Sequence, residues 1–533
     1  MTDAVFDAEG IPRRELLRIL GIGVPGALML SGCSVEPAPE YPSPIHDQPD
    51  PAPFTEGVMA GDPLPWGTTL WTRLETTGTT DVGVLWEVSE TPNFEVLLAG
   101  GTTTATATAD FTVKVQVTGL APDRWYWYRF EALGAASRIG RLRTAPSADA
   151  SASSLRFAYG SCQQLNDSHF VALSAIAREP NLDFLMHLGD YVYASDSGTQ
   201  TLDHYRGLYR RWRKEPLLRE VHAALPLVAM WDDGEFYNGV DRTGPPARLA
   251  AAQQAFWESM PLSSNAGAPI YRNLHWGALA DLAVIDVRSQ RDPAISGLDR
   301  TSGGGAAAYD PGRSTLGVTQ FAWLSDQLAG ASGLWSLVGS GVPISPWRLL
   351  NLEFLRPFRS GMPPSAGLYA PADGFDDYVQ ERSALLGAAS AGGRRDTIFA
   401  SAHTHMYLAS ELRENPDVAG PVLGYDFVSG SFTADPDVKK AYLGDLPAEV
   451  AKGILRFAET WILQQNPSMR HINMEDQGYV VMDLDPERCE VEYRLINTFD
   501  PDAEPYTGAR FRIRQGVPGM EILRADRPSG SIL

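Results

Sequence analysis

The pattern of apolar and polar positions divides the chain into two regions of different structure. From residue 54 to about residue 146, short runs alternate apolar and polar residues with a period of two. Half-buried β-strands show this period, and turn residues separate the runs. Strands are predicted at 68–73, 82–88, 110–117 and 125–133. The first region is therefore expected to be an all-β sandwich.

A linker of small and polar residues at 144–154 separates this region from one in which strand and helix patterns alternate. Strands are predicted at 155–161, 184–188, 227–231, 335–340, 397–401 and 425–429, with a strand-rich stretch at 270–287. Helices are predicted at 169–178, 202–224, 247–260, 319–328 and 378–389. Two last strands, 478–484 and 490–496, are expected to form a hairpin that closes the domain. This order indicates an α/β fold, which gathers ligands at the carboxyl ends of its parallel strands.

One turn in the first region has a specific precedent. Residues 120–126 read Leu-Ala-Pro-Asp-Arg-Trp-Tyr. This stretch resembles the corner of a fibronectin type III domain, where a tyrosine hydroxyl ties down the turn before its strand. Tyr126 is therefore expected to be structural.

The first 33 residues predict a targeting segment. Arg13 and Arg14 precede an apolar run at 19–30, and Leu-Ser-Gly-Cys ends at Cys33. The paired arginines resemble a twin-arginine export signal, and the last four residues resemble a bacterial lipoprotein cleavage box. We expect export by the twin-arginine machinery, cleavage before Cys33 and a lipid on that cysteine, which would hold the protein on a membrane outside the cytoplasm. The alternative is an amphipathic helix with a chance cysteine.

Residues 34–53 contain seven prolines and are expected to form a stiff spacer. With 533 residues, the chain is expected to have at least two domains, and we expect it to be a monomer. Its net charge of −21 excludes nucleic acid as a stable partner. An anionic substrate would be repelled as well, unless bound cations reverse the field at the site.

Side chains able to bind metal follow four of the predicted strands. In chain order they are Cys162, Asp190, Tyr193, Asp232, Asp233, Asn238, His403 and His405. Together they offer thiol, carboxylate, phenol, amide and imidazole groups, a mixed set that suits a pair of transition-metal ions. Each motif alone has an ordinary alternative. Cys162 could be a small buried hydrophobe, and the aspartates could belong to turns or helix caps.

Taken together, these motifs resemble the metallophosphoesterase superfamily and, within it, the alkaline phosphatase D family. The segments that carry the resemblance are 57–63, 70–74, 160–163, 187–193, 231–233 and 285–288. The resemblance covers nearly everything after the spacer. It implies a metallophosphoesterase-type α/β/β/α sandwich preceded by a small fibronectin-III-like β domain. The expected division is signal 1–33, spacer 34–53, β domain 54–146, catalytic domain 155–500 and C-terminal extension 501–533.

The resemblance also implies roles for individual residues. Cys162, Asp190 and Tyr193 would hold a ferric ion, and Asp190 would bridge to a second metal. The cluster would be completed by Asp233, Asn238 and His405. The implied cofactors are Fe3+ with one or two divalent ions, either Ca2+ or Zn2+/Mn2+. Arg288 is a candidate for contact with the phosphate group, with a structural salt bridge as the alternative.

Three positions depart from the family pattern. Gly234 stands where the family motif Trp-Asp-Asp-His-Glu has histidine. Residues 402–405 read Ala-His-Thr-His where the family has Gly-Asp-x-His, and a second imidazole favours zinc, manganese or iron over calcium. Ser468 stands where the family has a late histidine, which leaves His471 as the nearby substitute.

The expected function is hydrolysis of phosphate monoesters or diesters outside the cytoplasm by a metal-activated hydroxide. Nucleotides, phospholipid head groups and teichoic-acid-like polymers are candidate substrates. His403, if it is not a ligand, could protonate the leaving group. The alternative is a non-catalytic lipoprotein that uses the same fold as a binding or structural module, a reading kept open by Gly234 and Ser468.

Overall fold

The computed structural model describes residues 50–527 except 196–197, 264–266, 296–298, 300–302, 370–372, 392–393, 437–442 and 444–445. The predicted signal peptide, the lipidation site Cys33 and nearly all of the spacer lie outside the described residues. None of the helices in the described ranges combines the length and the apolar character that a membrane crossing needs.

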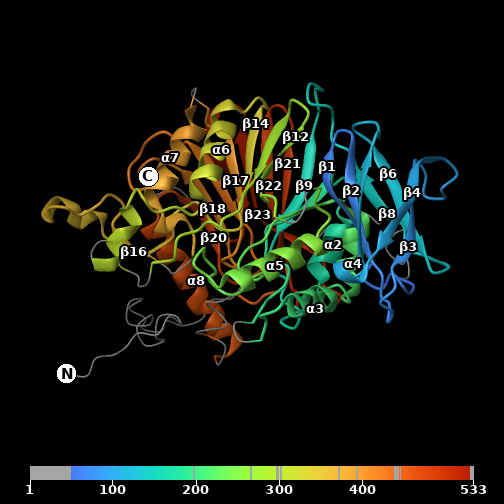
Figure 1. Ribbon diagram of the computed structural model, residues 1–533. Helices are drawn as coiled ribbons and strands as arrows, with labels where there is room; N and C mark the ends of the chain where they lie inside the picture. The colour runs from blue at the N-terminus through green and yellow to red at the C-terminus, as the bar shows by residue number, and fades with distance from the viewer. Residues whose placement is uncertain are drawn as a thin grey trace.

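Two large β-sheets form the centre of the molecule (Figure 1). In spatial order, the first contains β24 (Val517–Ala525), β23 (Tyr506–Arg514), β22 (Arg488–Ile496), β21 (Gln477–Leu484), β9 (Leu155–Gly160), β10 (Phe184–His187), β11 (Leu227–Ala229), β1 (Val58–Leu64), β2 (Gly67–Arg73) and β5 (Thr112–Thr118). The second contains β12 (Arg272–Trp276), β13 (Ala280–Val284), β14 (Trp335–Gly339), β17 (Thr397–Ser401), β19 (Gly424–Val428), β18 (Tyr407–Leu412) and β20 (Met469–Asn473).

Parallel strands lie at the middle of both sheets. In the first sheet β10 pairs in parallel with β9 and β11, and in the second β14 and β17 pair in parallel, as do β17 and β19. Apolar side chains from both sheets form one buried cluster between them, and the Tyr159 hydroxyl of β9 donates to the Phe427 carbonyl of β19 at 3.0 Å. The functional ends of the parallel strands are therefore held in a fixed relation by a shared core.

Helices cover the outer faces of the sheets. They are α2 (Val171–Arg178), α3 (Leu202–Trp212), α4 (Pro216–Ala224), α5 (Pro246–Ser259), α6 (Gly317–Gly330), α7 (Val379–Ala389) and α8 (Ala448–Gln465). Short 3-10 helices are η1 (Ala107–Ala109), η2 (Gly303–Tyr309), η3 (Glu353–Phe358) and η4 (Phe375–Asp377). Leu324 of α6 and Leu385 of α7 pack in one cluster with Phe399 of β17. The predicted α/β/β/α sandwich is thus confirmed.

The N-terminal β region shares a sheet with the α/β region. Its second sheet contains β4 (Leu97–Ala105), β3 (Val82–Ser89), β6 (Trp125–Ala132) and β7 (Ala135–Ala136), with β8 (Gly140–Arg143) pairing with β6. The opposing sheet of this sandwich is β1, β2 and β5, and β1 pairs in parallel with β11. The predicted tyrosine corner is confirmed, because the Tyr126 hydroxyl donates to the Ala121 carbonyl at 3.1 Å.

Two predicted elements differ from the structure. The helix expected at 202–224 is split into α3 and α4, because Pro216 begins a new helix whose Leu217 N–H is capped by the Glu215 carboxylate. The hairpin β21–β22 does not close the domain, since β23 and β24 extend the sheet beyond it. A separate hairpin, β15 (Arg348–Asn351) with β16 (Gly367–Tyr369), was not predicted.

Buried histidines predict sensitivity of the fold to acid. Burial lowers the pKa of His187 to about 3, and burial together with the Arg527 charge lowers the pKa of His471 to about 3. The unfolded chain protonates these imidazoles near pH 6.5, so their contribution to stability is complete above that pH and is lost as the pH falls. Below about pH 6, each of these two histidines should lower the free energy of unfolding by roughly 1.4 kcal/mol per pH unit. Urea unfolding between pH 6 and pH 5 should show a smaller loss of stability with falling pH in His471→Gln than in wild type. An unchanged slope would contradict the prediction.

Candidate metal centre

The candidate ligands come together where strands of both sheets end. Cys162 follows β9, Asp190 follows β10, and Asp233 follows β11, all in the first sheet. His403 and His405 follow β17 of the second sheet. Because the two sheets pack face to face, ligands from four loops meet at one edge of the sandwich.

The first group of donors is Cys162, Asp190 and His405. One ligand atom from each lies within 4.8 Å of those of the others, and all three residues are buried. The Cys162 thiol donates to Asp190 Oδ2 at 3.4 Å. His405 Nδ1 lies 3.2 Å from the Asp435 carbonyl, and donation to that carbonyl places the proton on Nδ1 and the lone pair that would bind a metal on Nε2.

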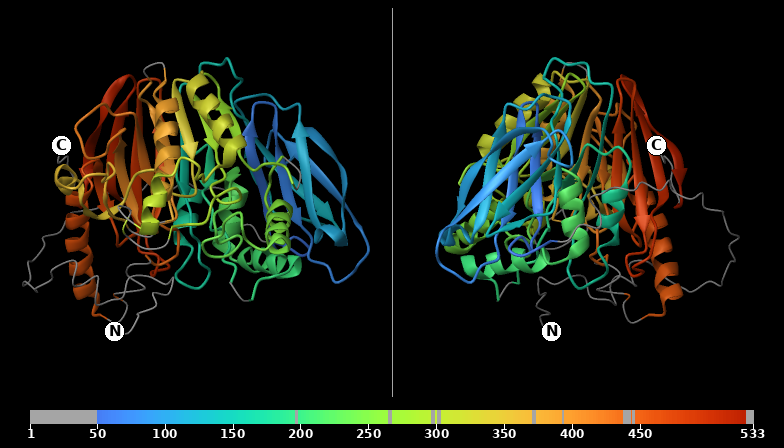
Figure 2. Two further views of the ribbon diagram at one scale, coloured as in Figure 1. Left: turned by 60° about the vertical axis from the view of Figure 1, so that its left-hand side comes forward. Right: turned by 90° about the vertical axis from the view of Figure 1, so that its right-hand side faces the viewer.

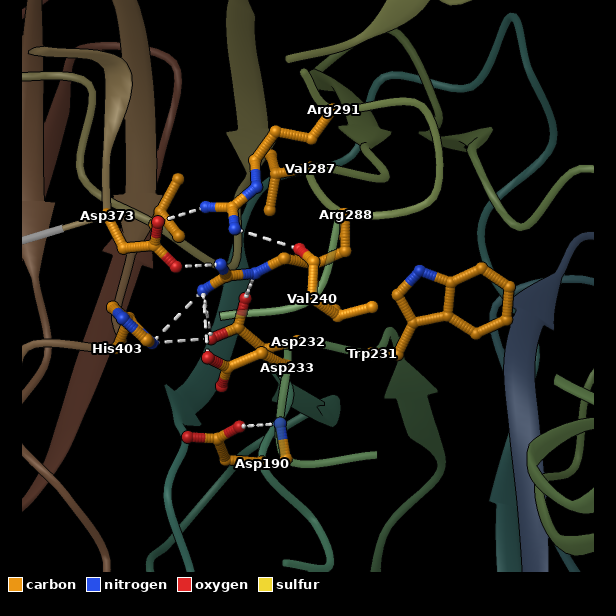
Figure 3. Close-up of polar contacts among 12 residues, drawn as sticks. Asp190, Trp231, Asp232, Asp233, Val240, Val287, Arg288, Arg291, Asp373 and His403 are labelled. Carbon is orange, nitrogen blue, oxygen red and sulfur yellow. Dashed lines mark hydrogen bonds and ion pairs between the residues drawn. The ribbon is translucent and has the colours of Figure 1, made fainter. Parts of the chain in front are cut away.

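The second group consists of Asp190, Asp232, Asp233 and His403, whose ligand atoms also lie within 4.8 Å of one another (Figure 3). Asp190 belongs to both groups, which is the place that a bridging ligand would occupy. A thiol, carboxylates and imidazoles in two overlapping sets fit a pair of transition-metal ions. The residues present therefore fit the cofactors that the resemblance implies.

The backbone at these ligands is strained. Cys162, Asp190, His403 and His405 have φ angles of 62°, 54°, 79° and 54°. Residues other than glycine seldom adopt this left-handed conformation, which costs on the order of 1–3 kcal/mol each when the surrounding structure imposes it. Four such residues in one cluster indicate a site whose geometry is maintained against local preference.

The electrostatics of the metal-free site favour a bound cation. Burial, followed by the charges of Asp233 and Asp232, raises the pKa of Asp190 well above its usual value. Burial and the Asp190 carboxylate likewise raise the pKa of the Cys162 thiol. Both shifts favour the protonated form of these groups, and a bound metal ion would displace the protons.

Arg288 lies at the centre of a buried ion-pair network (Figure 3). Its side chain is completely buried, with Nε 2.5 Å from Asp232 Oδ1 and Nη2 2.9 Å from Asp232 Oδ2. Its Nη1 pairs with Asp373, which also pairs with Arg291. The geometry shows the salt bridge that was one of the two expectations for Arg288. Direct contact with phosphate stays a prediction.

His403 is held by the same network. Its Nδ1 lies 2.6 Å from Asp232 Oδ2. Burial lowers the pKa of this imidazole, but the Asp232 carboxylate outweighs burial and raises the pKa to about 10 in the metal-free protein. With Nδ1–H donated to Asp232, the Nε2–H of the protonated ring is placed to donate to another group.

The other predicted site residues lie at different depths. Tyr193, three residues past Asp190, is half-buried, and the Asn238 side chain is exposed at the end of the loop after β11. Their roles as ligands stay predictions. His471 does not replace the family histidine, because it lies in β20 with its ring 5.9 Å from that of Tyr493 and 5.6 Å from that of Phe511. Ser468 instead donates to the Pro416 carbonyl.

Gly234 allows Asp190 to take its position. The Gly234 N–H donates to Asp190 Oδ1 at 2.8 Å, and a Cβ added at Gly234 would lie 2.6 Å from that oxygen and 2.7 Å from the Val192 carbonyl oxygen. We expect Gly234→Ala to displace the Asp190 carboxylate and to weaken metal binding about 10–100-fold. Equilibrium titration with Mn2+ measures this loss. Gly453→Ala in α8, where an added Cβ meets no atom within 4 Å, is the control. Equal affinity in both variants would contradict the prediction.

Comparison with known proteins agrees with this fold. The family model of the PhoD-like phosphatase matches residues 157–493, and that of the PhoD-like phosphatase N-terminal domain matches residues 39–146. The chain belongs to the PhoD-like phosphatase family, which supports a phosphoesterase activity.

Individual relatives extend the match over most of the chain. Alkaline phosphatase D of Bacillus subtilis (strain 168) is 27% identical over 553 residues, covering 96% of this chain and 88% of the relative. A solved structure of PhoD superposes with a TM-score of 0.77 at 26% identity, covering 93% of this chain and 95% of that chain. The resemblance to the alkaline phosphatase D family is confirmed.

Proposed function

We propose that this protein is a metal-dependent phosphoesterase that hydrolyses phosphate monoesters or diesters at the edge of the sandwich where the four ligand loops meet. The observation that carries the proposal is the pair of overlapping donor groups that share Asp190. A single donor group would suit one ion with a structural role. Two groups with one carboxylate in common suit two ions held close together, the arrangement used to clamp a phosphate group.

One ion would be held by Cys162, Asp190, Tyr193 and His405. The other would be held by Asp190 and Asp233 of the second donor group together with Asn238, while Asp232 and His403 of that group pair with each other. The thiol and imidazole donors support a transition metal at the first position, with Fe3+ as the proposed ion. Zn2+, Mn2+ or Ca2+ is proposed for the second. Such ions, when bound, polarise phosphate oxygens and lower the pKa of water.

The protein's own groups orient the substrate and manage protons. His403 is proposed to donate its Nε2 proton to the leaving oxygen, while Asp232 holds the opposite nitrogen. Arg288 fixes Asp232 from the other side and keeps the ring orientation constant. Positive charge from the bound ions and Arg288 would counteract the repulsion that the acidic chain exerts on an anionic substrate.

The site of action is proposed from the sequence alone. Export through the twin-arginine machinery and lipidation of Cys33 would place the enzyme outside the cytoplasm, tethered by the proline-rich spacer. Substrates would then be extracytoplasmic phosphate esters. We also propose that the protein acts as a monomer.

The proposal is tested with full-length protein exported by its native host. Metal content is measured by mass spectrometry, and hydrolysis is measured with p-nitrophenyl phosphate and bis(p-nitrophenyl) phosphate before and after chelation. We expect at least one transition metal per chain, and turnover that chelator removes and metal restores. Bound metal without turnover of either ester would favour the binding-module alternative. Absence of metal would overturn the metal-dependent function.

A further inference from the structure

A buried glutamate connects two of the ligand loops without belonging to either donor group. Glu235 follows Gly234 in the loop after β11, and its side chain is completely buried. Its carboxylate accepts hydrogen bonds from three backbone N–H groups. Oε2 accepts from Asp190 at 3.0 Å and from Asp232 at 2.9 Å, and Oε1 accepts from Tyr191 at 2.7 Å.

These hydrogen bonds join two loops at residues of the donor groups. Asp190 and Tyr191 belong to the loop after β10, whereas Asp232 belongs to the loop after β11. One oxygen of Glu235 bonds both loops at once, so the backbones that carry Asp190 and Asp232 cannot move apart without losing a bond. These three N–H groups lie beyond the ends of the strands, and the Glu235 carboxylate accepts their hydrogen bonds. Leaving a buried N–H group without an acceptor is costly.

The cost of a carboxylate here argues against a purely structural purpose. Glu235 places an ionisable group in a completely buried position beside the backbone of Asp190 and Asp232. If this side chain served packing alone, an apolar residue would avoid the cost of burying an ionisable group. A carboxylate is the side chain that accepts bonds on two oxygens and offers no hydrogen that would clash with an N–H group.

We propose that Glu235 is a positioning residue that sets the separation between the Asp190 carboxylate and the Asp232–Asp233 pair, acting through the backbone of both loops. The proposal rests on the proposed metal-dependent function. Glu235 itself touches neither substrate nor metal. It holds Asp190 in its left-handed conformation at φ 54°, which directs the carboxylate toward both donor groups.

Two substitutions separate position from charge. Glu235→Gln keeps the length of the side chain but loses the charge and one acceptor, so at most two of the three bonds persist. Glu235→Asp keeps the charge but is about 1.5 Å shorter and cannot reach both loops. Glu459→Gln is the matched control. Glu459 is also completely buried and accepts a backbone N–H, from Met474 at 2.8 Å, in α8 away from the ligand loops.

The experiment uses the full chain, stripped of metal and titrated with Mn2+, together with hydrogen exchange of the metal-free protein. We expect both Glu235 variants to bind Mn2+ about 10–100-fold more weakly than wild type. We also expect faster exchange in peptides covering 188–193 and 231–236. Glu459→Gln should lower the melting temperature while leaving affinity and exchange in these peptides unchanged.

Each other outcome overturns the assignment. Wild-type affinity in both Glu235 variants would show that the bonds do not position the ligands. Loss in Glu235→Gln alone would show that the charge matters and the bonds do not. Failure of both variants to fold, while Glu459→Gln folds, would show that the bonds serve the fold as a whole. If the wild-type protein binds no Mn2+ at all, the proposed metal-dependent function fails. The positioning role is then tested by hydrogen exchange alone, and unchanged exchange in the Glu235 variants would overturn it.

Discussion

Asp190→Asn is expected to abolish metal binding at both donor groups and to lower kcat by more than about 100-fold. Even residues that only support metal ligands cost 10–100-fold when they are replaced, and Asp190 is common to both groups. Asparagine keeps the shape and can still accept the Gly234 N–H, so the loop should retain its position. Metal content and hydrolysis of p-nitrophenyl phosphate are measured together.

The same variant should separate metal binding from stability. Burial and the neighbouring carboxylates make an ionised Asp190 unfavourable in the metal-free protein, so the melting temperature of metal-free Asp190→Asn should equal or exceed that of metal-free wild type. Added metal should raise the melting temperature of wild type alone. A variant that retains metal and at least a tenth of wild-type turnover would contradict the assignment of Asp190.

Arg288→Met is expected to lower the free energy of unfolding by about 3–5 kcal/mol. Its guanidinium is completely buried and pairs with both Asp232 and Asp373, so its removal leaves each of these buried carboxylates with a single cationic partner, His403 and Arg291 respectively. Arg288→Lys should recover only part of this loss, because an ammonium cannot reproduce the bidentate contact with Asp232. Urea-induced unfolding of the metal-free protein measures the effect.

Arg348→Met provides the matched control for this prediction. Arg348 is also completely buried and pairs with Asp417 through two nitrogens, and Asp417 belongs to neither donor group. We expect a similar loss of stability without a change in metal affinity. Arg288→Met should also disturb His403, which shares Asp232 with Arg288. A loss below about 1 kcal/mol in Arg288→Met would show that the network does not depend on its cation.

The central strands of both sheets and most of the helices could be predicted from the sequence, because their buried residues form continuous apolar runs or recur with a regular period. Strand β17 lies at the residues predicted for it, Thr397–Ser401. Helix α8 is absent from the predicted elements, although Leu455 and Ile462 lie at helical spacing and pack in one core cluster. Periodicity reports which face of a strand is buried but not which strand lies beside it, so the pairing of β1 with β11 could not be predicted.

Some residues of the site could likewise be predicted from the sequence, and others could not. The candidate ligands could be predicted because they occupy strand ends, where the topology of an α/β sheet gathers them. Asp373 could not, since it lies outside any motif and meets Arg288 across 85 positions of the chain. Glu235 was visible in the loop after β11, but its role depends on backbone N–H groups, which carry no signal in the sequence.

The strand order of the ten-stranded sheet has a consequence for how the chain is made. Its centre, β9 to β11, is flanked by strands from the N-terminus on one side and from the C-terminus on the other (Figure 2). Leu155 of β9 pairs with Leu484 of β21, and the sheet ends with β24. On the ribosome, β9 therefore keeps an open edge until almost the whole chain has been synthesised. Such long-range pairing folds slowly and exposes edges to aggregation, so we expect a newly made chain to need a chaperone until its last strand is released.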